Sequence, residues 1–321
     1  MNAAVVQAFD APPRYTTFDA PTPSDGEVLV NVSAAGLHRI VRALASGTHY
    51  GSTGELPFIP GVDGVGRLED GSRVFFAASR SPYGSFAEQS VANPAFCLPL
   101  PDALDDATAA GLANPAMSSW AALTMRAKLQ AGENVLILGA TGVSGKLAVQ
   151  IAKRLGAKRV IAVGRNPQAL EESRQLGADA IISLNQERDA LISALRSEWA
   201  VAGVDVVLDY LWGEPAERLL EAISQKGLQH AAARIRYLQI GSTAGNTINL
   251  PAATLRSSGL ELLGSGFGSV SIPDLLKSVG EFFNEAAQKP LQVDIQTVPL
   301  RDIEAMWNKP EQEARLVFQM R

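Results

Sequence analysis

The stretch that decides the fold runs from Val135 to Asn166 and reads VLILGATGVSGKLAVQIAKRLGAKRVIAVGRN. Its first four residues are a continuous apolar run, which is typical of a strand buried on both faces of a parallel sheet. Apolar residues then recur at helical spacing from Leu147 to Leu155, and Gly156 ends that segment. A second apolar run, VIAV, follows. The stretch therefore predicts a strand, a glycine turn, a helix and a second strand.

Three glycines in the turn favour a dinucleotide site. Gly139 permits a tight exit from the strand, Gly142 lets the backbone approach a pyrophosphate, and Gly145 lets the helix pack closely on the strand. The helix N-terminus also offers unpaired N–H groups and the positive end of its dipole to an anion. The alternative is that the glycines serve chain reversal alone, but the strand–turn–helix context favours a nucleotide.

The composition of the whole chain is typical of a soluble globular protein with about two domains. The 321 residues include 46% hydrophobic and 19% charged residues, and the net charge of −5 argues against nucleic-acid binding. Cys97 is the only cysteine, which favours a reducing compartment such as the cytoplasm over a disulfide framework. The N-terminal segment lacks a signal-peptide pattern and no apolar run reaches membrane-spanning length, so we expect no membrane partner.

Strands and helices alternate in the second half of the chain. Six apolar strand segments lie at 135–138, 160–163, 180–182, 204–209, 237–241 and 260–264. Helical segments separate most of them. This alternation predicts an α/β fold with a doubly wound parallel sheet.

The first 115 residues predict mostly short β-strands between Gly, Pro and Asp-Gly turns, and two more strands are expected at 293–300 and 314–320. We expect these C-terminal strands to rejoin the N-terminal region, so that the nucleotide domain is inserted into a discontinuous partner. The segment 229–236 is interpreted as an insertion that extends a helix. The nucleotide domain is expected at 123–265, and its partner at 1–122 and 266–321.

Seven short motifs, in their order and spacing, resemble the medium-chain dehydrogenase/reductase superfamily and, within it, the zinc-independent quinone oxidoreductase-like branch. They are EVLVNVSAAGL (27–37), PFIPGVDGVG (57–66), YGSFAEQSVAN (83–93), AMSSWAAL (116–123), GATGVSG (139–145), QIGSTAG (239–245) and LLGSGFG (262–268). The resemblance covers nearly the full chain. It implies a six-stranded Rossmann domain inserted into a GroES-like, mostly β, catalytic domain. It also implies a homodimer formed through the sheet edge around 260–264.

The same resemblance bears on metal binding. Zinc-dependent members of the superfamily place a cysteine and a histidine where this chain has His38 and Val62, and they often carry four further cysteines. Zinc needs three or four converging Cys, His or carboxylate ligands. We therefore expect no metal site. The alternative is a mononuclear site formed by His38, His49 and Asp63.

The residues after the second strand indicate which dinucleotide is bound. In NAD-binding units an acid lies about 20 residues past the glycines and bonds the ribose 2′-hydroxyl. Here Gly164, Arg165 and Asn166 stand at that place, and none of them is acidic. An arginine attracts a 2′-phosphate and can bind it through two parallel hydrogen bonds. We therefore expect NADP(H); the alternative is that Arg165 only solvates a turn beside the Asn166 helix cap.

Further cofactor contacts are implied by the resemblance, and they agree with the rule that ligands bind at the carboxyl ends of parallel strands. Ser118 matches a small hydroxyl residue near the nicotinamide, and Tyr210 is expected along the cofactor. The expected cofactor-binding residues are Ser118, Gly139, Ala140, Thr141, Gly142, Val143, Gly145, Gly164, Arg165, Asn166, Tyr210, Gly241, Ser242, Thr243, Gly264, Ser265 and Gly266.

A site without a Lewis acid suits hydride transfer to an acceptor that is already electrophilic. We therefore expect an enzyme that transfers hydride from NADPH to a small-molecule quinone or α,β-unsaturated carbonyl compound. Tyr50 is the expected catalytic donor to the developing oxyanion, because the family often has an active-site tyrosine in this loop. His49 is the second candidate, and the alternative for Tyr50 is a surface side chain. Two other functions stay open: a nucleotide-binding redox sensor or structural protein, and a zinc-dependent alcohol dehydrogenase.

Overall fold

The computed structural model describes residues 1–224, 233–266, 268–309 and 314–320, so the first half of the expected insertion, 229–232, lies outside the described residues. The second half contradicts the expected helix extension, because Arg234, Ile235 and Arg236 belong to a strand, β12 (Arg234–Gln239). The chain forms two compact units, Met1–Pro115 with Leu276–Arg321, and Ala116–Leu275. They divide within two helices, α2 (Asp106–Ala121) and α8 (Ile272–Gln288), so the domain limits expected near 122 and 266 stay a prediction. No helix within the described ranges is long and apolar enough to cross a membrane.

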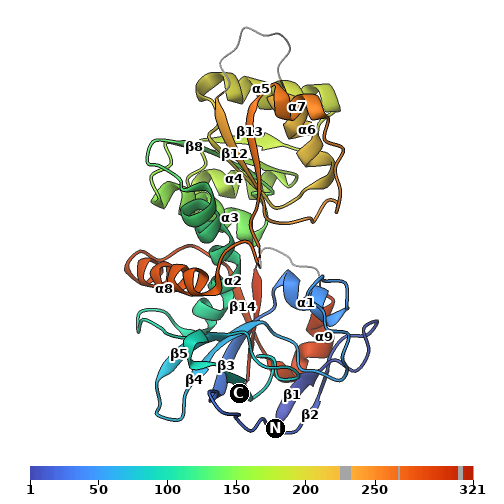
Figure 1. The fold of residues 1–321 in the computed structure, drawn as a ribbon, viewed down its shortest axis with the longest axis vertical. Helices are drawn as coiled ribbons and strands as arrows, with labels where there is room; N and C mark the ends of the chain where they lie inside the picture. The colour runs from blue at the N-terminus through green and yellow to red at the C-terminus, as the bar shows by residue number, and fades with distance from the viewer. Residues whose placement is uncertain (225–232, 267, 310–313, 321) are drawn as a thin grey trace. The chain divides into compact units, whose positions relative to one another are not determined.

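The unit Ala116–Leu275 is built on a parallel sheet, of which Figure 1 labels β8, β12 and β13. Its strand order is β10-β9-β8-β11-β12-β13. Every neighbouring pair in this sheet is parallel. The strands are β8 (Asn134–Leu138), β9 (Arg159–Gly164), β10 (Ala180–Ser183), β11 (Val206–Asp209), β12 (Arg234–Gln239) and β13 (Gly259–Gly264). The doubly wound α/β prediction is confirmed, with a switch in strand order between β8 and β11.

Helices separate the strands of this sheet, as the alternation in the sequence predicts. They are α3 (Val143–Arg154), α4 (Pro167–Gln175), α5 (Arg188–Ala202), α6 (Gly213–Ile223) and α7 (Ala252–Arg256), and a π-helical turn, η2 (Ala122–Ala127), extends α2. Leu136 and Leu138 of β8 pack in one core with Leu195 of α5 and Leu219 of α6. Ile137, which alternates to the other face, is equally buried. The continuous apolar run of β8 therefore reflects a strand covered on both faces.

The other unit is mostly β. Its larger sheet has the order β14-β15-β3-β4-β5-β7, with β6 pairing on β3, and β1 pairs with β2 in a separate ribbon. The strands are β1 (Asn2–Val5), β2 (Arg14–Thr17), β3 (Val28–Gly36), β4 (Asp63–Arg67), β5 (Arg73–Ala77), β6 (Gln89–Ala92), β7 (Cys97–Pro99), β14 (Ile295–Pro299) and β15 (Arg315–Gln319). The short helices of this unit are α1 (Arg39–Ala45), η1 (Pro94–Phe96), η3 (Leu300–Asp302) and α9 (Ile303–Trp307).

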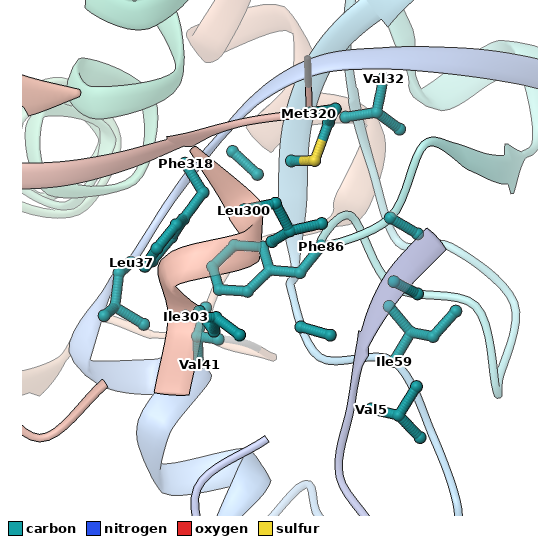
Figure 2. Packing of buried hydrophobic residues seen from close by; sticks show 14 of the residues in the cluster. Val5, Val32, Leu37, Val41, Ile59, Phe86, Leu300, Ile303, Phe318 and Met320 are labelled. Carbon is teal, nitrogen blue, oxygen red and sulfur yellow. The ribbon is translucent and has the colours of Figure 1, made fainter. Parts of the chain in front are cut away.

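The two ends of the chain build this unit together. β15 pairs antiparallel with β3, with Val317 opposite Gly36. Figure 2 shows Phe86 packed in one apolar cluster with residues from both ends of the chain. The ring centroid of Phe86 lies 5.5 Å from that of Phe318 and 6.5 Å from that of Trp307. The insertion of a parallel-sheet domain into a discontinuous, mostly β partner is therefore confirmed.

Candidate cofactor site

The glycine turn between β8 and α3 depends on glycine at two places. Gly139 has a φ of +96°, a region that favours glycine, and its N–H donates to the Val163 carbonyl of β9 at 2.9 Å. The N–H of Ala140 donates to the same carbonyl at 3.0 Å. A Cβ on Gly145 would lie 2.2 Å from the carbonyl oxygen of Gly139. Only glycine therefore allows α3 to approach the strand end this closely.

Gly142 leaves an open approach to the first turn of α3. It is the N-cap of this helix, no side chain caps the turn, and no acidic residue lies in it. Apart from the adjoining residues, no described atom lies within 4 Å of the place that a Cβ of Gly142 would occupy. The first N–H of α3 with an intrahelical partner is that of Lys146, which donates to the Gly142 carbonyl. The N–H groups of Val143, Ser144 and Gly145 are therefore the candidate binding place for an anion such as a pyrophosphate.

A second loop meets the glycine turn at Gly164, the last residue of β9. A Cβ on Gly164 would lie 2.4 Å from Cγ2 of Thr141, so the two loops are in contact. Arg165, which follows, is exposed. Asn166 is the N-cap of α4, and its Oδ1 accepts two backbone N–H hydrogen bonds at 3.0 and 3.2 Å. Arg165, the candidate ligand for a 2′-phosphate, thus lies between the Gly164–Thr141 contact and the capped start of α4.

Tyr210 follows β11 and faces a serine of α2. Its hydroxyl lies 3.5 Å from Oγ of Ser118. Burial raises the pKa of Tyr210 to about 12, while hydrogen bonds with Ser118 and Ser119 act in the opposite direction. The phenol therefore stays protonated at neutral pH and keeps an O–H group to donate.

The end of β12 is tied to the end of β11. The N–H of Gly241 donates to the Asp209 carbonyl at 3.1 Å, and a Cβ on Gly241 would lie 2.7 Å from the Tyr210 carbonyl oxygen. Oγ1 of Thr243 donates to that same oxygen at 3.1 Å. Ser242, between them, is exposed. The Thr243 hydroxyl therefore holds the turn after β11.

The end of β13 is held in a similar way. The Gly264 carbonyl accepts a hydrogen bond from Nε of Arg126 at 3.0 Å. The N–H of Ser265 donates to a β12 carbonyl at 2.9 Å, and the N–H of Gly266 donates to Oγ of Ser269 at 2.9 Å. Because parallel strands end at one edge of their sheet, β8, β9, β11, β12 and β13 bring the expected cofactor residues that follow them to this edge. Ser118 comes from α2.

A buried acid behind the site did not follow from the sequence. Oδ2 of Asp209 accepts a hydrogen bond from the Tyr237 hydroxyl at 2.7 Å, and Oδ1 accepts from the N–H groups of Leu211 and Trp212 at 2.7 and 2.9 Å. Burial raises the pKa of the Asp209 carboxyl, and burial next to Asp209 raises the pKa of Tyr237 well above its ordinary value. The feature of the sequence that could have indicated a buried role for Asp209 is its position as the last residue of an apolar strand. The acid fixes the turn that carries Tyr210.

The two expected catalytic residues belong to the mostly β unit, in the loop after α1. Tyr50 is 79% exposed, and its ring lies against that of His49 with centroids 4.1 Å apart and planes tilted by 31°. Nδ1 of His49 accepts the N–H of Gly51 at 3.0 Å, and partial burial lowers the pKa of His49. A neutral imidazole that accepts at Nδ1 carries its proton on Nε2. Tyr50 and His49 therefore form one stacked pair with two hydrogen-bond donors.

His38 pairs with Asp63 in the same unit. Nε2 of His38 lies 3.2 Å from Oδ1 of Asp63, and both residues are buried. His49 does not join them. Among the residues with described positions, no three His, Cys, Asp or Glu side chains gather closely enough to bind one metal ion. The convergence of His38, His49 and Asp63, considered above as the alternative metal site, is therefore wrong: only two of the three meet.

Known proteins resemble this chain in sequence and fold. A family model described as zinc-binding dehydrogenase matches residues 144–284. A probable NADPH-dependent quinone reductase of Emericella nidulans, tdiC, is 28% identical over 343 residues, which cover 96% of each protein. The quinone oxidoreductase of Rattus norvegicus is 30% identical over 217 residues, which cover 64% of each protein. The structure of the quinone oxidoreductase from Thermus thermophilus, also determined with NADPH, matches with a TM-score of 0.81, 25% identity and full coverage of both chains.

Proposed function

The chain belongs to the medium-chain dehydrogenase/reductase superfamily, in its zinc-independent quinone oxidoreductase-like branch, and from this premise we propose that it is an NADPH-dependent quinone reductase. The observation that carries the proposal is the contact between two loops of the unit Ala116–Leu275. There an open glycine turn lies beside Arg165, where an NAD-binding unit would have an acid. Relatives of nearly the same length, named for NADPH and quinone, support this cofactor and this acceptor.

The residues present fit NADPH. The first N–H groups of α3 would hold the pyrophosphate, because Gly142 leaves their approach open. Arg165 would bind the 2′-phosphate through charge-assisted hydrogen bonds. Ser118 and Tyr210 offer hydroxyl groups to the nicotinamide half, and the expected residues at the ends of β12 and β13 complete the proposed site.

The bound nicotinamide supplies hydride. A quinone accepts it readily because the reduced product is aromatic. The chain has to orient the acceptor and donate a hydrogen bond to the oxygen that gains negative charge. Tyr50 is our proposed donor, since its side chain is exposed and its ring is stacked on His49. Nε2–H of His49 is the second proposed donor.

An α,β-unsaturated carbonyl compound is the second proposed class of acceptor. Its β-carbon is electrophilic, and the enolate formed at its oxygen needs the same hydrogen-bond donor. A redox sensor or structural protein with little catalysis is not favoured, because the two relatives described above are named as enzymes, a quinone reductase and a quinone oxidoreductase. A zinc-dependent alcohol dehydrogenase is not favoured either. The zinc-binding family model matches only 144–284, which includes neither His38 nor Asp63, and Cys97 is the only cysteine in the sequence.

The proposal also includes a homodimer in the cytoplasm. β13 is the outer strand of its sheet, and Leu262 on this strand is 38% exposed, so an edge is available for pairing with a second copy. A single cysteine in the whole sequence suits a reducing compartment. Light scattering of the purified protein tests the dimer, and Leu262→Lys should shift the population toward monomer. A parent protein that is monomeric at every concentration would contradict this part.

The test of the function is turnover. Purified protein is offered NADPH with a panel of quinones, enals and enones, and consumption of NADPH is followed by its absorbance. We expect turnover with quinones, and no turnover with a saturated ketone of the same size, which serves as the control. Tight NADPH binding in calorimetry without turnover on any acceptor would contradict an enzyme and favour the sensor.

A further inference from the structure

The loop after β10 holds the backbone of Arg165. Gly164 and Ser183 are paired neighbours in the parallel register of β9 and β10. Beyond this pair, the N–H of Leu184 donates to the Gly164 carbonyl at 2.7 Å. Nδ2 of Asn185 then donates to the Arg165 carbonyl at 2.8 Å. A side chain twenty residues away therefore fixes the one peptide from which the proposed 2′-phosphate ligand extends.

The side chain of Arg165, in contrast, has no hydrogen-bond or ion-pair partner among the residues that the structure describes. Cations close to the glycine turn in sequence have carboxylate partners: Lys146 pairs with Glu172, and Lys153 pairs with Asp179 at 2.6 Å. No Asp or Glu in the described part of the chain forms an ion pair with Arg165. A fixed backbone with an unpaired guanidinium is the arrangement expected of a ligand prepared for an anion.

We infer that Asn185 is a positioning residue for cofactor choice: it favours NADPH over NADH by holding Arg165 in place for the 2′-phosphate. This inference rests on the proposed function, in which Arg165 binds that phosphate. Asn185 contacts the backbone of Arg165 and not its side chain. Its contribution therefore lies in the ordering of the loop before binding, which lowers the entropic cost of forming the phosphate contact.

Asn185→Ala tests the inference, with the affinities for NADPH and NADH measured by calorimetry on the full chain. We expect NADPH affinity to fall about two- to tenfold, the range for one neutral hydrogen bond, and NADH affinity to stay unchanged. Gln186→Ala is the matched control. Nε2 of Gln186 donates to the Ser183 carbonyl at 2.5 Å in the same exposed loop, so this change removes a comparable bond that does not touch Arg165.

The same substitution in an Arg165→Ala background separates positioning from loop stability. In that background residue 165 keeps its backbone carbonyl, so Asn185 can still donate to it. The guanidinium that Asn185 would position is gone. We expect Asn185→Ala to cause no further loss of NADPH affinity in that background. A purely structural role would give the same loss with or without the arginine side chain.

The outcomes distinguish the inference from the function on which it rests. A parent protein that binds NADH as tightly as NADPH overturns the proposed cofactor and the inference together. A parent that prefers NADPH, with Asn185→Ala unchanged, overturns the inference alone. So does an equal loss for both cofactors, or a loss that persists in the Arg165→Ala background.

Discussion

Gly164 at the end of β9 lies directly against the side chain of Thr141 in the glycine turn: a Cβ on Gly164 would be 2.4 Å from Cγ2 of Thr141. The loop proposed for the pyrophosphate and the loop proposed for the 2′-phosphate therefore share one contact. Neither can shift without the other, because backbone on one side meets a β-branched side chain on the other. Substitutions in each loop can nevertheless separate cofactor binding from folding.

Gly142→Ala and Gly145→Ala should differ in kind. Gly142 has a φ of −86° and open space around its missing Cβ, so alanine fits the protein but fills the approach to the helix N-terminus. We expect an unchanged unfolding temperature and a loss of about tenfold or more in affinity for NADPH and NADH. Alanine at Gly145 meets backbone at 2.2 Å and should lower the free energy of unfolding by about 1–3 kcal/mol. Calorimetry measures cofactor affinity and thermal unfolding measures stability for both variants. An equal drop in unfolding temperature for the two variants would contradict a binding role for Gly142 and a packing role for Gly145.

Arg165→Ala should weaken NADPH binding about ten- to a hundredfold, the range for one charge-assisted hydrogen-bonding group, and leave NADH nearly unchanged. Arg174→Ala is the matched control, since Arg174 is an exposed arginine of α4 that already pairs with Glu171 at 3.3 Å. Calorimetric titration of both cofactors measures the effect. A comparable loss in the two variants would show that general positive charge, and not Arg165, attracts the phosphate.

Activity should be independent of zinc, because the chain has one cysteine and its buried His38–Asp63 pair provides two ligands where zinc needs three or four. Metal analysis of purified protein should find well under one zinc per chain. Turnover of a quinone should survive prolonged chelation. Activity that is lost on chelation and restored by zinc alone would contradict the branch assignment.

Tyr50→Phe should lower the turnover of an enone and leave NADPH affinity nearly unchanged. Loss of a main oxyanion donor typically costs about a hundred- to a thousandfold in rate. A quinone should suffer less, because its aromatic product is stable and takes protons from water. Steady-state kinetics on one enone and one quinone measure both effects. If the variant matches the parent on every substrate, the donor is another group, and His49→Ala is the next variant to measure.

The pH dependence of stability should report on Tyr210. Burial raises the pKa of Tyr210 to about 12, whereas an unfolded tyrosine ionises near pH 10. Between these values the folded state binds more protons than the unfolded state, so the free energy of unfolding falls as pH rises through this window. Tyr210→Phe removes this term and should lose less stability than the parent from about pH 10 to about pH 12. Urea denaturation across the range checks it; parallel curves would place Tyr210 in a solvated environment.

The sheet strands were predictable where their residues are apolar and less so where they are charged. β8 and β9 begin and end close to the expected residues, because a buried parallel strand needs an unbroken apolar run. β12 starts at Arg234, three residues before the expected start. Arg236 in this strand is buried and pairs with Glu133 at 2.5 Å. Because Glu133, distant in sequence, neutralises the buried Arg236, the charged residue breaks the apolar pattern but the strand continues.

The sequence by itself determined the glycine turn, the helix that follows it and the presence of Arg165 after β9. A turn and a helix start depend on residues only a few positions apart, so a local pattern is sufficient for them. Tertiary structure alone decided which side chains meet. Asn185 contacts the backbone of Arg165 because β10 lies beside β9 with Ser183 next to Gly164, and His38 contacts Asp63 across 25 residues. Strand order and register arise from burying a whole core at once, and no short segment contains that information.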